Sequence, residues 1–290
     1  MKVAITGAHS FTGRYVAELL LQKGFSIVNL TNHPNRPWKI HSAHIIDFPL
    51  SFEKEHLVNC LKDCDVLVQT YWVRFDDKLG VSRDTVTNNS KMLIDCAREA
   101  GVRKVVFTSH TQTSLGSPFP YIREKAKVEE YLKQSGLEWG IVKPCAIFGR
   151  TPEESILINN MAYLIKKFPF FPLPGDGNYH FQFVHAQDMA QLIVASLESG
   201  NNYEIDAVGP DNISFKQIVE ECAKAFGTRC RPLTGINKRL VNLMTMPLNW
   251  YFEDILMDTH DLDLMATGLT CSHDPPTGKI SLIEWVRQNK

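Results

Sequence analysis

The stretch TGAHSFTG, residues 6–13, decides how the chain folds. It directly follows the apolar run Val3-Ala4-Ile5 and leads into GRYVAELLLQKG, whose apolar residues recur at helical spacing. A glycine-containing turn between a strand and a helix is the usual binding place of a dinucleotide pyrophosphate, because the helix N-terminus offers amide groups and a partial positive charge. The stretch therefore predicts a nucleotide-binding loop.

The glycines of this stretch have distinct expected roles. We expect Gly7 to form the tight turn and Gly13 to let the helix and the strand pack closely. The middle position of the expected G-x-x-G-x-x-G pattern holds Ser10, whose Cβ takes up room but whose hydroxyl can donate to a phosphate. A structural turn without a ligand is the alternative, and the place of the stretch between strand and helix favours the nucleotide. The candidate loop residues are Gly7, Ser10, Phe11, Thr12 and Gly13.

Strand-like runs alternate with helical patterns in the first half of the chain. Their continuous β-branched character is typical of strands that are buried on both faces. The runs are residues 2–6, 25–30, 43–47, 65–71, 104–109 and 138–144. Repeated strand–helix units of this length predict an α/β fold, a Rossmann-type doubly wound parallel sheet.

The pattern breaks after Arg150, and we expect a smaller C-terminal substrate lobe there. The predicted division is a Rossmann domain of residues 1–150, to which 182–208 returns, and a lobe of residues 151–181 and 209–290. Within the returning part, residues 187–199 read as a helix and 202–209 as a strand.

Other local signals mark the second half of the chain. The stretch FPFFPLPGDGNYH, residues 168–180, is dense in Pro, Gly and aromatics and predicts a loop. Ser214 with Gln217 and Ser281 with Glu284 are capping boxes that open two helices. The Leu- and Met-rich run 237–269 predicts helices of the lobe packed on the sheet, with an apolar substrate site or a membrane-surface contact as alternatives.

The region after the second strand indicates which nucleotide binds. An NAD site usually carries Asp or Glu about 20 residues past the loop, to bind the ribose 2′-hydroxyl. This chain has no carboxylate between Glu18 and Asp47. Asn32 and His33 could hydrogen-bond a 2′-phosphate and Arg36 could pair with it, so the sequence favours NADP(H) over NAD(H). A solvated polar turn is the alternative.

The stretch YIREK places Tyr121 and Lys125 four residues apart, on the same face of a helix. An ammonium beside a phenol stabilises the phenolate, which makes the tyrosine a usable general acid and base. Tyr163 and Lys167 repeat the spacing, but they lie past Arg150, outside the sheet pattern, and we interpret them as a helix face.

Composition excludes several classes of function. Among 290 residues, 31 Lys and Arg nearly balance 32 Asp and Glu, which argues against nucleic acid or an anionic membrane as partner. We expect a cytoplasmic protein without signal peptide or transmembrane segment. The seven cysteines contain no C-x-x-C and the ten histidines no H-x-x-x-H, so we predict reduced cysteines and no metal site. Carboxylate pairs such as Glu129-Glu130 are expected on solvated helix faces.

Together these motifs resemble those of an extended-type, atypical short-chain dehydrogenase/reductase, in the NmrA-like and complex I accessory-subunit branch that is grouped with NAD-dependent epimerases and dehydratases. The resemblance covers most of the chain. The stretches that carry it are TGAHSFTG, Asp47-Phe48, DVLVQTYW (65–72), AREAGVRKVVFTS (97–109), PYIREKAKVEEYLKQSGLEW (120–139), VKPCAIFG (142–149), QFVHAQDMA (182–190) and DAVGP (206–210).

The resemblance implies roles for particular residues. It implies that Asp47 and Phe48 flank the adenine, and that Thr70, Tyr71 and Trp72 line the far side of the cofactor. In the same way, Lys125 would hold the nicotinamide ribose, the residues from Pro144 to Ile147 would touch the nicotinamide, and Tyr121 would exchange a proton with a substrate hydroxyl or carbonyl.

A third catalytic residue would polarise the substrate oxygen, and the strand end TSHTQTS leaves its identity open. Ser109 and Thr111 compete for the role, and His110 stands at the usual place. Two functions stay open as well. The first is an oxidoreductase or epimerase-like enzyme for a small or nucleotide-linked substrate, either monomeric or a homo-oligomer. The second is an NADP(H)-binding redox sensor or assembly subunit without turnover.

Overall fold

The computed structural model contains two compact units. The first unit consists of Met1–Lys143 and Met189–Asp206, and the second of Pro144–Asp188 and Ala207–Lys290. The first unit is therefore discontinuous in sequence. The structure describes residues 1–36, 39–73, 82–149, 156–237, 239–241, 243, 263–264 and 267–289.

The first unit is built around a seven-stranded sheet with the order β10-β6-β5-β4-β1-β2-β3. Its strands are β1 (Lys2–Thr6), β2 (Ser26–Leu30), β3 (Ile45–Phe48), β4 (Val66–Gln69), β5 (Lys104–Thr108), β6 (Glu138–Pro144) and β10 (Tyr203–Ala207). The pairs from β3 through β6 are all parallel. The chain starts in the middle of the sheet, winds outward through β2 and β3, and then returns to β4 on the other side of β1. This topology confirms the predicted Rossmann-type α/β fold.

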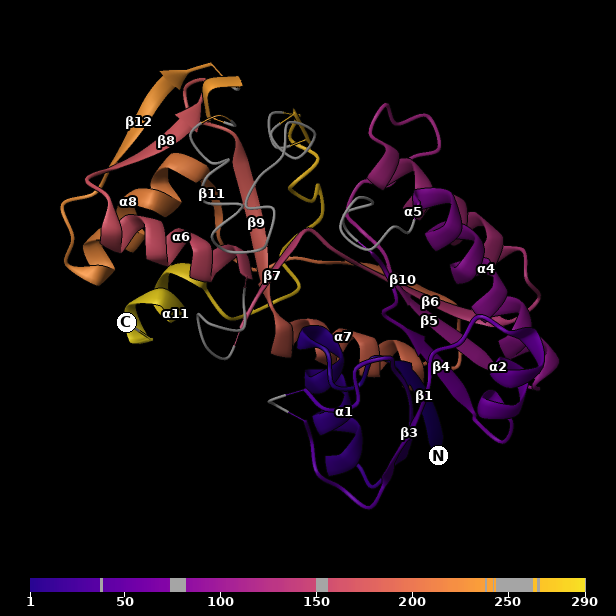
Figure 1. Cartoon of the computed structure of the whole chain (residues 1–290). Helices are drawn as coiled ribbons and strands as arrows, with labels where there is room; N and C mark the ends of the chain where they lie inside the picture. The colour runs from indigo at the N-terminus through magenta and orange to yellow at the C-terminus, as the bar shows by residue number, and fades with distance from the viewer. Residues whose placement is uncertain are drawn as a thin grey trace. The chain divides into compact units, whose positions relative to one another are not determined.

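Helices cover both faces of this sheet (Figure 1). The helices α2 (Lys54–Leu61), α4 (Arg83–Glu99) and α5 (Pro120–Lys133) cover one face, and α1 (Phe11–Gln22) and α7 (Ala186–Glu198) cover the other. Central strand residues such as Val68 and Val105 are therefore fully buried. Burial on both faces accounts for the continuous apolar runs in the sequence.

A lysine is buried within this first unit. Lys104, in β5, is fully buried, and its Nζ donates to the carbonyl oxygens of Ser199 and Asn201, both at 2.9 Å. The two acceptors follow α7, so the returning part of the chain provides the hydrogen-bond partners of a cation from the first half. Without them the ammonium would be buried and unpaired, at a large cost in free energy.

The second unit contains two small sheets. One has the order β11-β9-β7, formed by Asn212–Ser214, His180–His185 and Ala146–Phe148. The other pairs β8 (Phe170–Pro174) in parallel with β12 (Arg231–Ile236). The helices of this unit are α6 (Ile156–Lys167), α8 (Phe215–Phe226) and α11 (Leu282–Gln288).

The prediction of a loop over residues 168–180 is wrong, because β8 and the first residue of β9 lie in it. Phe171 and Leu173 are buried while Phe170 is exposed, which is the alternation of a strand. Pro172 and Pro174 are tolerated because both strands of a two-stranded sheet are edge strands. The density of proline concealed the strand from sequence reasoning.

The predicted helix starts of the second unit are confirmed. Ser214 forms the complete capping box with Gln217 at the start of α8. Ser281 caps α11 through the backbone N–H of Glu284. Tyr163 packs against the apolar core of this unit and Lys167 is exposed. Most of the run 237–269 lies outside the described residues.

No helix in the described part of the chain is long and apolar enough to cross a membrane. All seven cysteines lie in that part, and none of them forms a disulfide.

Candidate functional site

The glycine loop joins β1 to α1 in a tight turn. Gly7 has a φ of +83°, in the left-handed region that favours glycine. A Cβ on Gly13 would lie 2.0 Å from the carbonyl oxygen of Gly7, so only glycine fits there. Ser10, at the middle position, is the N-cap of α1, and its Oγ accepts from the backbone N–H of Gly13 at 3.1 Å. The serine thus stabilises the start of the helix on which a phosphate would rest.

Asp47, in β3, anchors this loop from a distance. Its Oδ1 accepts from the Asn29 amide at 2.9 Å and lies 3.0 Å from Nε2 of the buried His9, and its Oδ2 pairs with Lys39 at 2.6 Å. Asn29 in turn accepts from the backbone N–H of Ala8 at 2.6 Å. Burial acts to raise the pKa of Asp47, but the hydrogen bonds from Lys39 and Asn29 hold it below its ordinary value. Sequence reasoning missed His9 and Lys39, although His9 lies within the loop itself.

The three residues predicted to read a 2′-phosphate follow β2. Asn32 is exposed, and its amide donates to the Leu50 carbonyl and accepts from the Leu50 N–H, both at 3.0 Å. These bonds commit the Asn32 side chain to the backbone. His33 is exposed and Arg36 is partly exposed. A ligand can therefore reach His33 and Arg36, whereas contact with the Asn32 amide would compete with an existing pair of hydrogen bonds.

The segment after β4 is held close to the end of β1. The Oγ1 of Thr6 accepts from the backbone N–H groups of Thr70 and Tyr71, both at 2.8 Å, and the Thr70 hydroxyl donates to the Thr6 carbonyl. Asn89 donates to the Tyr71 hydroxyl at 3.2 Å. Trp72 follows directly, and its ring centroid lies 6.1 Å from that of Tyr121, edge to face. The ends of β1, β4 and α5 therefore meet at Trp72.

Tyr121 and Lys125 lie in the first two turns of α5, which begins at Pro120. The Lys125 Nζ donates to the Thr108 carbonyl at 2.7 Å and lies 4.2 Å from the ring centroid of Trp72 and 4.9 Å from that of Phe107. The same Nζ is 6.0 Å from the ring centroid of Tyr121. Lys125 is only 3% exposed. Burial lowers its pKa to about 7, so the charge of this lysine changes near neutral pH.

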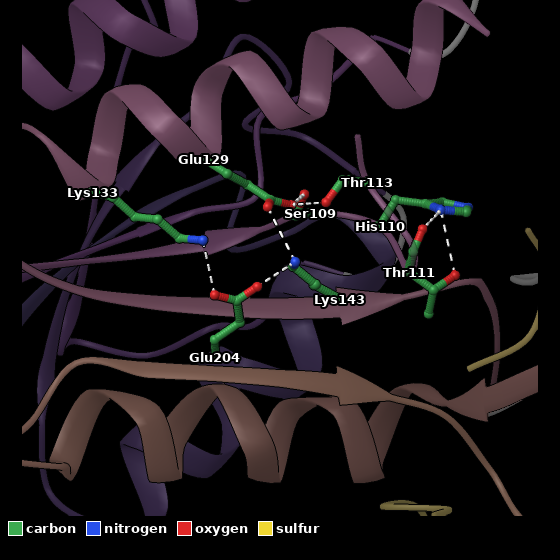
Figure 2. Close-up of polar contacts among 8 residues, drawn as sticks. All are labelled: Ser109, His110, Thr111, Thr113, Glu129, Lys133, Lys143 and Glu204. Carbon is green, nitrogen blue, oxygen red and sulfur yellow. Dashed lines mark hydrogen bonds and ion pairs between the residues drawn. The ribbon is translucent and has the colours of Figure 1, made fainter. Parts of the chain in front are cut away.

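Ser109, a candidate for the third catalytic residue, is buried and turned toward a carboxylate. Its hydroxyl donates to Glu129 Oε1, which also accepts from the Thr113 hydroxyl at 2.8 Å (Figure 2). The other oxygen of Glu129 lies 3.1 Å from the Lys143 Nζ. The prediction that Glu129 lies on a solvated helix face is wrong, since it is 4% exposed, whereas its neighbour Glu130 is exposed. Glu129 is on the face of α5 that packs against the sheet.

His110 lies beside Tyr121, and Thr111 lies beside His110. The His110 ring is 5.5 Å from the Tyr121 ring, edge to face. Its Nδ1 lies 2.7 Å from the Thr111 carbonyl oxygen, to which it donates. The Thr111 Oγ1 is 3.5 Å from the same ring nitrogen, and both residues are buried. His110 therefore packs against Tyr121 through its ring.

The remaining predicted cofactor ligands are Phe48, Pro144, Ile147, Phe11 and Thr12. Phe48 is partly buried and packs against the core of the first unit. Pro144 and Ile147 belong to the second unit, Pro144 as the last residue of β6 and Ile147 within β7. Phe11 and Thr12 open α1, and the Phe11 ring packs edge to face on Tyr15. The first unit thus brings together the glycine loop, Asp47, Trp72, Tyr121 and Lys125 at the carboxyl ends of its strands.

Comparison with known proteins identifies relatives of this chain. It is 25% identical over 250 residues to an uncharacterized protein of Mycobacterium tuberculosis, covering 84% of this chain and 25% of that protein. It is also 25% identical over 228 residues to the mitochondrial NADH dehydrogenase (ubiquinone) 1 alpha subcomplex subunit 9 of Arabidopsis thaliana, covering 74% of this chain and 56% of the subunit. The chain therefore spans a quarter of the first relative and little more than half of the second.

Solved structures share the fold. The NADPH-dependent quinone oxidoreductase of Escherichia coli, complexed with NADPH, superimposes with a TM-score of 0.76 at 17% identity, over 99% of each chain. The family model of the NAD dependent epimerase/dehydratase family matches residues 3–209, which is more than half of the sequence. The predicted resemblance is confirmed: the chain belongs to the NAD dependent epimerase/dehydratase family.

Proposed function

We propose that this protein binds a nicotinamide dinucleotide at the glycine loop and acts as an oxidoreductase or epimerase-like enzyme on a small or nucleotide-linked carbonyl or alcohol. The observation that carries the proposal is the grouping of Tyr121, Lys125 and Trp72 at the strand ends of the unit that also holds the loop. In doubly wound sheets, ligands bind at the carboxyl ends of the strands.

The residues present fit the dinucleotide. A Cβ at Gly13 would meet the Gly7 carbonyl, so the loop keeps the close approach of helix and strand that a pyrophosphate site needs. Amide groups of the first turn of α1 would hold the pyrophosphate, and Lys125 would hold the nicotinamide ribose. When bound, the nicotinamide supplies or accepts the hydride.

Tyr121 is the proposed proton donor and acceptor. A protonated Lys125 near the phenol favours the phenolate, which lets Tyr121 take a proton from an alcohol or return it to a carbonyl oxygen. To reach a ribose, the Lys125 ammonium would exchange its bond with the Thr108 carbonyl for bonds to ribose hydroxyls. Because the pKa of Lys125 is about 7, we expect the reaction to slow as the pH rises through the neutral range.

We also propose that NADP(H) is preferred over NAD(H). No carboxylate lies between Glu18 and Asp47 to repel a 2′-phosphate, and the Asp47 carboxylate is already paired with Lys39. His33, Arg36 and Lys39 place positive or hydrogen-bonding groups after β2 and before β3. The NADPH in the structure of the Escherichia coli relative is compatible with this preference.

A second function is favoured by one observation. The Ser109 hydroxyl, which would polarise a substrate oxygen, is bound to Glu129 instead. A protein that binds NADP(H) without turnover, as a redox sensor or assembly subunit, would have no need of that hydroxyl. The Arabidopsis relative is itself named as a subunit of a larger complex. The cytoplasmic location stays a prediction from the sequence, and the choice between a monomer and a homo-oligomer stays open.

The first experiment is a calorimetric titration with NADPH and with NADH in buffer of low phosphate content, followed by turnover assays with aldehydes, ketones and quinones. Tyr121→Phe should lower turnover by roughly 100-fold or more and leave the NADPH affinity unchanged. Tyr163→Phe is the matched control, because Tyr163 has the same spacing to a lysine but packs in the second unit. NADPH binding without turnover on any substrate would favour the sensor, and binding of neither nucleotide would overturn both functions.

A further inference from the structure

Glu129 is a buried carboxylate with several partners. It lies one helical turn after Lys125 on α5 and is 4% exposed. Its Oε1 accepts from the hydroxyls of Ser109 and Thr113, which stand at the two ends of one short segment. Its Oε2 faces the Lys143 ammonium at 3.1 Å. Figure 2 shows these side chains converging on the carboxylate.

The segment that Glu129 holds has a strained backbone. Gln112 has a φ of +52°, in the left-handed region that a residue other than glycine adopts at a cost of about 1 kcal/mol or more. Such a conformation persists only where the surroundings fix it. The Ser109 and Thr113 hydroxyls do so here, and between them the segment carries His110, whose ring lies against Tyr121. The Glu129 carboxylate is thus connected to Tyr121 through this segment, because the segment carries the His110 ring that packs on Tyr121.

Glu129 also acts electrostatically on Lys125, which is buried on the same helix one turn earlier. Burial lowers the pKa of Lys125 to about 7, and Glu129 is the charge that acts in the opposite direction. Lys143, from β6, faces the same carboxylate, and His110 and the two hydroxyls come from the segment after β5. Farther out, Glu204 of β10 binds both Lys143 and Lys133, the latter at 2.9 Å. These charged side chains extend from Lys125 to Glu204, which is exposed.

We propose that Glu129 is the positioning residue of the Tyr121–Lys125 site: it is a buried counter-charge that favours the protonated form of Lys125, and it anchors the Ser109–Thr113 segment that holds His110 against Tyr121. The effect on turnover rests on the function proposed above. The effects on the charge of Lys125 and on the segment do not, because neither needs substrate or cofactor.

The test follows the titration of Lys125 by NMR, with lysine labelled at the ε-carbon and Lys125→Met used to assign the signal. Glu129→Gln keeps an oxygen that can accept from Ser109 and Thr113 but removes the charge. It should move the midpoint of the Lys125 titration to lower pH by about one unit. Glu204→Gln is the matched control, because it removes a charge of the same network that pairs with Lys143 and Lys133 and is not on the helix that carries Lys125, and it should shift the midpoint far less.

In an active enzyme, Glu129→Gln should also lower kcat at neutral pH, leave KM and the NADPH affinity nearly unchanged, and recover activity as the pH is lowered. An unchanged Lys125 midpoint in Glu129→Gln, or an equal shift in Glu204→Gln, would overturn the role as counter-charge. Both results can be read even if the protein shows no turnover, so failure of the proposed function is distinguished from failure of this inference.

Thr113→Val tests the anchor without altering a charge. It removes one of the two hydroxyls that bind Glu129, and should change the ring nitrogen and proton resonances of His110 in a protein that stays folded. Glu204→Gln should leave these resonances in place. Unchanged His110 signals in Thr113→Val would contradict the anchoring role, and this reading stands even if Glu129→Gln fails to fold.

Discussion

The glycine loop after β1 and the Ser109–Thr113 segment after β5 are both sharp turns with a left-handed backbone residue, but they are stabilised differently. Both leave a buried parallel strand and turn sharply at its carboxyl end, and both contain a residue with positive φ. The first uses glycine at that position, Gly7, whereas the second forces a glutamine, Gln112, into it. Each is held by a carboxylate distant in sequence, Asp47 for the first and Glu129 for the second.

The two turns differ in whether their own residues tolerate the backbone conformation. In the first turn the chain itself is adapted, because Gly7 tolerates the backbone conformation and Gly13 makes room for it. In the second turn a glutamine, Gln112, occupies the left-handed conformation, and the turn is held by the bonds from the Ser109 and Thr113 hydroxyls to Glu129. A turn of the first kind should survive loss of its anchor better than a turn of the second kind.

The largest effect is expected from Gly13→Ala. The new Cβ would lie 2.0 Å from a backbone oxygen that cannot move aside cheaply, so we expect a loss of about 3 kcal/mol in the free energy of unfolding and loss of nucleotide binding. Urea denaturation and calorimetric titration measure the two effects. Gly200→Ala is the control, because a Cβ there has no neighbour within 4 Å. Equal free energies of unfolding for Gly13→Ala and Gly200→Ala would contradict this prediction, because they would show that the loop accommodates a Cβ at residue 13.

Asp47→Ala removes the anchor of the first turn. It leaves the Asn29 amide, His9 and Lys39 without their shared acceptor, and we expect a loss of roughly 2 kcal/mol at neutral pH. The pKa of Asp47 is lowered in the folded state, so its stabilisation is fully present above the ordinary pKa of an aspartate and is lost as the pH falls through the lower, folded-state value. The difference in the free energy of unfolding between wild type and Asp47→Ala, measured by urea denaturation, should therefore become smaller at acid pH.

Asp65→Ala serves as the control for this prediction, since Asp65 is exposed and accepts from the backbone N–H of Lys2. It should cost less than Asp47→Ala. A gap between wild type and Asp47→Ala that stays constant down to strongly acid pH would contradict the assigned charge state.

The smallest effect is expected at Gln112. Asparagine tolerates the left-handed region better than glutamine, so Gln112→Asn should raise the free energy of unfolding by about 0.5 kcal/mol, while the β-branched Gln112→Val should lower it by about 1 kcal/mol. Thermal unfolding of the two variants shows directly whether each is more or less stable than the wild type. If both variants had the stability of the wild type, the segment would carry no strain for Glu129 to fix.

The sequence was sufficient to predict the sheet, because parallel strands buried on both faces leave continuous apolar runs. The runs at 2–6 and 138–144 coincide with β1 and β6 to the residue. Where prolines interrupt the run, as in β8, the pattern gives no signal although the strand forms. Local chemistry was readable too, since the Ser214 capping box needs only residues three apart.

The anchors could not be predicted in the same way. Glu129 continues the four-residue spacing of Tyr121 and Lys125, but only the orientation of α5 on the sheet decides that this face is buried while Glu130 is exposed. The partners of Asp47 lie on β2, in the glycine loop and after β2, and they meet only when the strands pair in register. Spacing along the chain therefore suggested the candidate residues but not the carboxylates that hold them.

The discontinuity of the first unit has a consequence for synthesis on the ribosome. Residues 189–206 emerge only after the whole stretch 144–188 has been made, yet they carry the carbonyls that bind Lys104 and the Glu204 carboxylate that binds Lys143. A nascent chain that ends before them has the Lys104 ammonium without its two acceptors and Lys143 paired with Glu129 alone, and β6 is still an open edge. The nucleotide-binding half is thus not a module that can be cut out at residue 143, and it becomes complete only when the chain has returned to it.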